Sequence, residues 1–225
     1  MKNLFLVAAI CSSLAANAQV SIAPEVGLNY TQLSSTADNT EFQNTSLISP
    51  RLGLNFNLPL FNSSAVYLQP GLFYSGKGGR YEYATDLAGS RFEGDYTFRV
   101  NYIEIPVQLM VDFDLGSLGG IFIGAGPYVA YGLSGTQKGE TRLNGTLLAS
   151  ASDDVDFGSK AGQINNLDYG AGFGAGYRFA FGLYARLQAG IGLANIQNEA
   201  NTSRYNRGAT LSVGYNIRFK NNRSE

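Results

Sequence analysis

The chain has 225 residues and a formal net charge of −1, which suits one domain or one barrel and gives no global electrostatic basis for binding nucleic acid. Charged residues make up only 15% of the chain, and it contains no histidine. The absence of histidine excludes Ser-His-Asp catalysis, histidine metal sites and the usual proton shuttle near neutral pH.

Residues 1–18 have the pattern of a secretory signal peptide. A lysine precedes an apolar core at Leu4–Ala16, and the small residues Ala16 and Ala18 predict cleavage before Gln19. The apolar run is too short for a transmembrane helix, which needs about 20 residues. The only cysteine lies in this segment, so the mature chain would form no disulfide. Export leaves two classes open: a soluble protein, or a membrane β-barrel with spanning strands of about 9–11 residues.

Eight segments after the signal alternate apolar and polar residues with the period of half-buried β-strands. In chain order they are Ser21–Thr31, Leu47–Leu58, Ala65–Lys77, Phe98–Phe113, Ile121–Ser134, Leu167–Arg178, Gly182–Ala194 and Gly208–Lys220. One face of each segment is nearly free of charge. The other face carries single charges, amides, hydroxyls or glycine among tyrosine and phenylalanine, which indicates a crowded interior.

Two features separate a membrane barrel from a soluble sandwich, whose strands also alternate. Aromatic residues lie near the ends of the apolar faces, as in interfacial girdles; they are Tyr30, Phe56, Tyr74, Tyr131, Tyr169, Tyr177 and Phe219. Long connections alternate with the short turns Pro59–Ser64, Asp114–Gly120 and Phe179–Phe181. The sequence therefore predicts an all-β fold: an eight-stranded antiparallel up-and-down transmembrane β-barrel with long outer loops and short periplasmic turns.

Five prolines fall within the predicted strands: Pro24, Pro50, Pro70, Pro106 and Pro127. Proline removes a hydrogen-bond donor from the ladder and is normally confined to sheet edges or bulges. Because a closed barrel has no edge, we expect β-bulges near several of these prolines.

One segment, NYIEIPVQLMVDFDL at Asn101–Leu115, resembles the PorT-like outer-membrane β-barrel domain family. Members of that family have a Tyr-x-Glu-Ile-Pro strand here, as this chain has from Tyr102 to Pro106. The segment FYSGKGG at Phe73–Gly79 is similar to the family's Tyr-Ser-x-Lys-Gly segment. The resemblance spans nearly all of the mature chain. It implies an eight-stranded outer-membrane barrel and implies no activity.

The stretch GAGFGAG at Gly170–Gly176 has a spacing close to that of a dinucleotide-binding loop. Such a loop needs a following helix and an acidic residue about 20 residues on, but the sequence after it alternates as a strand. We interpret it as a strand with a glycine ladder on the lumen face, formed by Gly170, Gly172, Gly174 and Gly176. The short turn that follows predicts paired positions summing to an even number near 360. That register would set Gly176, Gly174 and Gly172 opposite Tyr184, Arg186 and Gln188.

Several polar and charged residues fall on the inward faces: Glu25, Arg51, Glu104, Arg178, Arg186, Gln188 and Arg218. An eight-stranded barrel is barely wider than its own side chains, so charges there must pair or meet water. We expect Glu104 to pair with at least one of Arg51, Arg186 or Arg218. Two interpretations stay open: a polar plug that fills the barrel, or a narrow selective pore.

The sequence predicts no catalytic, cofactor or metal site, and hence no enzyme. Asp153, Asp154 and Asp156 in the longest loop could bind a cation, but they do not match a calcium-loop spacing. We interpret them as a solvated turn.

Our leading hypothesis is an integral protein of the cell outer membrane with a largely plugged lumen. It would act in envelope structure, or in adhesion or partner docking through its long extracellular loops. One alternative is a narrow porin or small-solute transporter whose inward arginines form an anion path. A second is a soluble exported β-barrel that binds an apolar ligand. We expect outer-membrane lipid around the barrel, an extracellular or envelope protein as loop partner, no nucleic-acid partner and a monomer.

Overall fold

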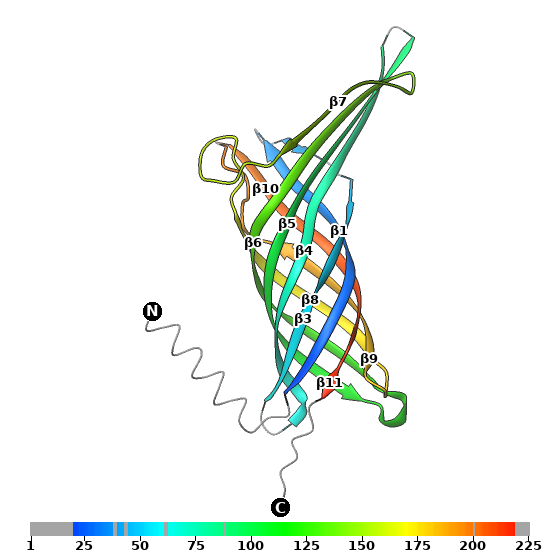
Figure 1. Cartoon of the computed structure of the whole chain (residues 1–225), viewed down its shortest axis with the longest axis vertical. Helices are drawn as coiled ribbons and strands as arrows, with labels where there is room; N and C mark the ends of the chain where they lie inside the picture. The colour runs from blue at the N-terminus through cyan, green and yellow to red at the C-terminus, as the bar shows by residue number, and fades with distance from the viewer. Residues whose placement is uncertain are drawn as a thin grey trace, which may run out of the picture.

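The chain forms a closed antiparallel β-barrel (Figure 1). The structure is a computed structural model that describes residues 20–37, 40–42, 45–60, 63–87, 89–199 and 201–218. The barrel strands are β1 (Ser21–Ala37), β3 (Leu47–Leu60), β4 (Ser63–Leu87), β5 (Ser90–Asp114), β6 (Gly120–Leu143), β8 (Leu167–Arg178), β9 (Leu183–Gly192) and β10 (Thr202–Tyr215). Each strand pairs with the next, and β1 closes the ring by pairing with β10. The predicted eight-stranded up-and-down topology is confirmed.

Three short elements complete the described chain: β2 (Thr40–Phe42), β11 (Ile217–Arg218) and the 3-10 helix η1 (Gly116–Leu118). Among the described residues, no helix is long and apolar enough to cross a membrane. The last predicted strand begins earlier than expected, because β10 begins at Thr202 rather than Gly208; β11 ends at Arg218. The expected signal peptide at 1–18, and Phe219 and Lys220, lie outside the described residues.

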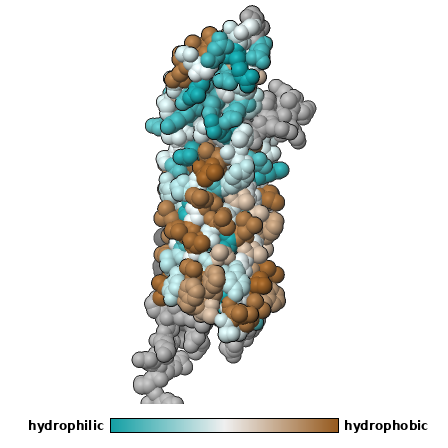
Figure 2. Space-filling view, turned by 90° about the vertical axis from the view of Figure 1, so that its right-hand side faces the viewer, coloured by the Kyte–Doolittle hydropathy of each residue, from teal (hydrophilic) through white to brown (hydrophobic). Residues whose placement is uncertain are grey.

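The period-two pattern separates the two faces of the barrel wall as predicted. In β1 the outward side chains Val26 and Leu28 are each 57% exposed, whereas the inward Glu25 and Asn29 are 2% and 3% exposed. Figure 2 shows hydrophobic residues gathered over the lower and middle part of the molecule and mostly hydrophilic residues above them. The wall therefore presents apolar side chains outward and buries polar side chains inside, the reverse of a soluble domain.

Two of the predicted long loops are regular β-structure. β4 and β5 stay paired out to Leu87 opposite Ser90, and β6 continues to Leu143, where the chain turns back as β7 (Thr146–Asp154). Residues 79–87, 90–98, 135–143 and 146–154 thus form a sheet of four strands beyond the barrel, which we call the ribbon (Figure 1). We call this end of the barrel the ribbon end, and the opposite end, with the short turns, the turn end.

The prolines do not create the bulges that the sequence led us to expect. In the described ladders, register shifts occur at Pro59/Leu60, Asn101/Tyr102 and Thr141/Arg142, and none lies at the five strand prolines. At Pro70, Pro106 and Pro127 the pairing instead lapses over two positions and resumes in the same register. The missing donor is tolerated as a local gap, so the inward and outward faces do not exchange.

Candidate functional site

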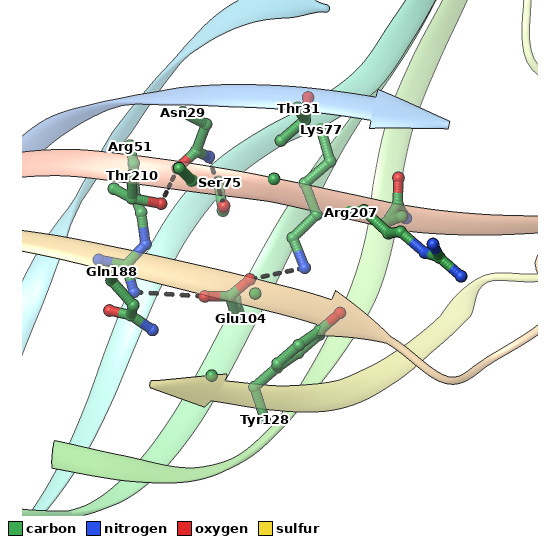
Figure 3. A pocket seen from close by; sticks show the side chains of 15 residues that line it. Asn29, Thr31, Arg51, Ser75, Lys77, Glu104, Tyr128, Gln188, Arg207 and Thr210 are labelled. Atoms are coloured by element: carbon green, nitrogen blue, oxygen red, sulfur yellow. Dashed lines mark hydrogen bonds and ion pairs between the residues drawn. The ribbon is translucent and has the colours of Figure 1, made fainter. Parts of the chain in front are cut away.

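The lumen holds a chain of alternating charges, which we call the ionic chain. Its members, in order of contact, are Arg186, Glu25, Arg51, Glu104, Lys77 and Asp168. The successive closest nitrogen–oxygen distances are 3.6, 2.9, 3.2, 2.8 and 3.1 Å. The expected pair between Glu104 and Arg51 is present, and Lys77 binds the other oxygen of the same carboxylate (Figure 3).

Six different strands supply the ionic chain, one side chain each. β1 provides Glu25, β3 Arg51, β4 Lys77, β5 Glu104, β8 Asp168 and β9 Arg186. Each residue has the inward parity of its strand, so closure of the ring brings them together inside the barrel. Three cations and three anions balance one another. This balance matters because an isolated charge buried away from water is strongly unfavourable.

Neutral groups add hydrogen bonds to several of these charges. Glu25 accepts hydrogen bonds from Tyr184 Oη at 2.7 Å and from Asn55 Nδ2 at 2.9 Å. Arg186 donates to Gln69 Oε1 at 2.6 Å. Two of the cations also lie over aromatic rings. The Arg51 guanidinium is 3.5 Å from the centroid of Phe73, and Lys77 Nζ is 3.9 Å from that of Tyr128. Hydrogen bonds and cation–π contacts replace the water that these charges would otherwise hold.

Apolar side chains form a cluster in the lumen at the ribbon end. We call this cluster the cap; its members are Leu33, Ile164 and Ile196, with Phe98, Val155 and Phe157 packed against them. The connection after β7 crosses the mouth and is fixed to the next connection by backbone bonds, such as Asn165 N–H to the Ile196 carbonyl at 2.9 Å. Asn198 donates to the Gly158 carbonyl at 2.6 Å. Part of the longest predicted loop is thus folded into the barrel mouth.

A second apolar cluster lies in the lumen at the turn end. It consists of Ala23, Met110, Phe122 and Tyr184, with Tyr67 packed against them. Below it Arg178 binds Asp112 through two bonds of 2.9 Å. Arg178 was grouped with the interior charges by its parity, but the structure places it at this rim, separate from the ionic chain.

The glycine stretch forms part of β8, with its glycines on the inward face. The observed register pairs Gly174 with Gln188 and Gly176 with Arg186, so paired numbers sum to 362, and the expected pairing was displaced by two positions. Large side chains do lie over these glycines, but two of them, Tyr128 and Phe122, belong to β6 rather than to β9. A Cβ at Gly170 would lie 2.8 Å from the Tyr128 ring, and one at Gly176 would collide with Phe122.

One row of glycines borders a small internal cavity of about 50 Å³. Gly126, Gly172, Gly190 and Gly208 are directly paired across four neighbouring strands. The last three line the cavity together with polar residues, among them Gln188 (Figure 3). A cavity this size holds a few water molecules, since each needs roughly 10–15 Å³ of such volume.

Sequence reasoning placed Glu25, Arg51, Glu104 and Arg186 on the lumen face, and the structure brings these four together. It missed Lys77 and Asp168 as members of the same chain. Lys77 lay on the expected inward face, but no partner was assigned to it. Asp168 shares the even numbering of the glycine ladder, and this parity could have identified it as a lumen residue. Arg218 pairs with Ser21 through its backbone, but its side chain lies outside the described structure.

No group of three or more His, Cys, Asp or Glu side chains that could hold a metal ion occurs in the described part of the chain. Asp153 and Asp154 lie at the end of β7, where both are exposed. The described lumen offers paired charges between two apolar clusters.

Comparison with known proteins gives a family and a set of structural likenesses. The family model for the outer membrane protein beta-barrel domain matches residues 15–194. The solved structure of Ail, the attachment invasion locus protein of Yersinia pestis, is 8% identical with a TM-score of 0.42, covering 88% of this chain and 99% of that one. Neisserial surface protein A is 14% identical, with a TM-score of 0.36 and coverage of 89% and 96%. The N-terminal β-barrel domain of Pseudomonas aeruginosa OprF is 16% identical, with a TM-score of 0.32 and coverage of 89% and 98%. No curated protein sequence matches.

Proposed function

Because this chain belongs to the outer membrane protein β-barrel domain family, we propose that it is a closed, non-conducting barrel that holds its ribbon outside the cell to dock a partner. The protein is located in the cell outer membrane, and a soluble exported barrel is therefore set aside. Within the family we assign it to the PorT-like group, on the motifs at Tyr102–Pro106 and Phe73–Gly79. We propose a role without enzymatic activity.

The closure of the lumen carries this proposal. A solute would have to pass the cap, then the ionic chain, then the turn-end cluster. Glu25, Arg51 and Glu104 are between 2% and 6% exposed, so the interior of the barrel is filled rather than hollow. Opening a path would separate buried opposite charges, which is strongly unfavourable without water to receive them.

The orientation follows from the two ends. Residues 1–18 act as an export signal, and the turn end, where β1 begins and β11 ends, faces the periplasm. The ribbon then projects from the cell surface, with outer-membrane lipid around the apolar wall. This arrangement suits a rigid membrane anchor whose contacts are made by the ribbon.

A bilayer recording of the refolded mature chain tests the proposal. We expect no steady single-channel steps in membranes where an open porin, measured in parallel, conducts. Detergent extraction and heat-modifiable migration on gels show in the same preparation that the barrel is folded.

A narrow porin is the second candidate, and the internal cavity beside the glycine row favours it. The same recording separates the two functions. Steady steps in the wild type that Arg186→Ala abolishes would establish a pore through the ionic chain and contradict the closed barrel.

A further inference from the structure

The ribbon has two chemically different faces. Residues directly opposite one another on antiparallel strands share a face, so the pairings define rows. Two successive rows form what we call the tyrosine face; its members are Tyr81, Tyr96, Gly139 and Ala151, and Tyr83, Gly94, Thr141 and Ala149. These two rows contain no charged residue. The reverse face carries Arg80, Glu82, Arg91, Glu93, Asp95, Lys138, Glu140 and Arg142.

The tyrosine rings lie against the sheet beside glycines. A Cβ at Gly139 would lie 2.9 Å from the Tyr96 ring, and one at Gly94 would collide with the ring of Tyr83. The rings of Tyr83 and Tyr96 are inclined by only 19°, with centroids 6.5 Å apart. The Tyr81 ring lies 6.1 Å from that of Tyr83 and is inclined to it by 38°. The three rings together form an aromatic panel.

The panel is open to solvent. Tyr81 and Tyr83 are each 38% exposed and Tyr96 is 51% exposed, although all three lie within paired strands. An apolar sheet face is normally covered by a second layer of structure. Ring surfaces left open at the outer end of a membrane protein therefore indicate an external ligand.

We propose that the tyrosine face binds a neutral glycan, and this rests on the proposed function in requiring the ribbon to lie outside the cell. A pyranose ring has a face of C–H groups that packs on an aromatic ring, and its hydroxyls can bond to the tyrosine and Thr141 hydroxyls. The absence of charge on the two rows matches an uncharged ligand. Single-stranded nucleic acid would need a basic groove around the rings, which these rows do not provide.

The parity of β4 indicates where the glycan comes from. The inward series Phe73, Ser75 and Lys77 continues through Gly79 to Tyr81 and Tyr83, so the tyrosine face is the extension of the lumen face. The charged face extends the lipid-facing wall. Sugars of lipids beside the barrel would meet the charged face, whereas the tyrosine face looks over the barrel mouth. The ligand is therefore a glycan that reaches the cell from outside.

Titration of the mature protein in nanodiscs tests the inference. The probes are maltohexaose, cellohexaose, laminarihexaose and mannohexaose, with dextran sulfate as an anionic comparison, followed by saturation-transfer NMR and calorimetry. We expect at least one neutral hexaose to bind, and Tyr83→Ser with Tyr96→Ser to weaken that binding by about tenfold or more, because ring stacking is lost.

Two variants separate stacking from a purely structural role of the rings. Tyr96→Leu still covers Gly139, so amide exchange in the ribbon should stay at the wild-type level while glycan binding weakens about threefold or more. The double variant Arg91→Ala, Glu93→Ala changes only the reverse face and should bind the hexaose within about twofold of the wild type.

Three results would overturn the inference: no neutral hexaose binds, Tyr96→Leu binds the hexaose as tightly as the wild type, or only dextran sulfate binds. A dimer in nanodiscs that Tyr96→Leu dissociates would also overturn it, since a second copy would then cover the panel. Channel steps in the wild type would instead contradict the closed barrel and leave a positive glycan result in place.

Discussion

Glu104 is the side chain on which the ionic chain depends most directly. Its two oxygens bind two cations on different strands, Arg51 at 3.2 Å and Lys77 at 2.8 Å, and its side chain is only 8% exposed. Buried pairs contribute little compared with apolar packing, but the loss of one partner leaves the other charge without compensation. Removal of the Glu104 carboxylate should therefore lower the free energy of unfolding far more than removal of one partner of an exposed ion pair.

Glu104→Ala should lower the free energy of unfolding by about 3–5 kcal/mol, because Arg51 and Lys77 stay buried without their shared anion. Urea unfolding from lipid vesicles measures the change. Glu93→Ala is the matched control, since it removes a carboxylate whose partner Arg91 is exposed, and it should leave the midpoint unchanged. Equal stability of Glu104→Ala and the wild type would show that the ionic chain is not structural.

Two glycines of the lumen face should respond in opposite ways to a larger side chain. A Cβ at Gly174 would lie 2.6 Å from the Leu187 carbonyl oxygen, whereas one at Gly190 would meet nothing within 4 Å. Gly174→Leu should lower the free energy of unfolding by about 1–3 kcal/mol through overpacking. Gly190→Ala should raise it by about 0.4–1 kcal/mol, since the unfolded chain loses freedom. The same urea assay compares them, and a destabilised Gly190→Ala would contradict the open space assigned beside it.

At the scale of elements, the barrel strands could be read from the sequence and the ribbon could not. Period-two alternation requires two different environments, and the wall between lipid and lumen provides them. The ribbon is solvated on both faces. Polar residues such as Arg80 and Thr97 alternate there with tyrosine, and no continuous apolar face marks the segments as strands. One local signal was available: Asn144-Gly145, with φ of 50° and 80°, is a two-residue hairpin turn that predicts the return of β7.

The same limit explains which parts of the site could be predicted. Glu25, Arg51, Glu104 and Arg186 follow from parity alone. Their partners depend on which strands face each other across the lumen. These strands are far apart in the sequence, so the alternation pattern carries no information about the pairing. Asp168 is the second residue of its predicted strand, so parity alone could have placed it inside the barrel. Asn206, which donates to Asp168 at 3.2 Å, lies before the predicted start of the last strand. Only Asn206 was therefore lost at an element boundary, where a periodic pattern has the least information.

The charged face of the ribbon should respond to acid before the barrel does. A hydrogen bond from Arg80 holds the pKa of Asp95 below its ordinary value. Because the folded pKa is below the unfolded one, near 3.9, the stabilisation is complete above that pH and is lost as pH falls through the folded pKa.

We therefore expect protection of ribbon amides against hydrogen exchange to fall about two- to fivefold between about pH 5 and pH 2, as suits a half-exposed ion pair. Barrel amides should keep their protection over the same change. In Asp95→Asn the ribbon should start less protected and lose this pH dependence. Ribbon protection that falls equally in Asp95→Asn would assign the effect to other carboxylates.

For the whole molecule, the two ends of the barrel predict its orientation in the membrane. Short turns and the first and last described strand ends lie together at one end, and the charged ribbon lies at the other. Insertion from the periplasm carries polar connections across the bilayer once, and outer-membrane barrels accordingly keep short turns on the periplasmic side. The ribbon should thus be accessible on intact cells and the turn end should not.

Cysteine labelling tests this orientation without background, because the only cysteine of the chain, Cys11, lies in the expected signal peptide. Ser150→Cys in β7 and Ser117→Cys in η1 are matched changes at exposed serines. A membrane-impermeant maleimide should label Ser150→Cys on intact cells, and Ser117→Cys only after the outer membrane is permeabilised. The reverse pattern would place the ribbon in the periplasm, and both the docking role and the external glycan would then lose their basis.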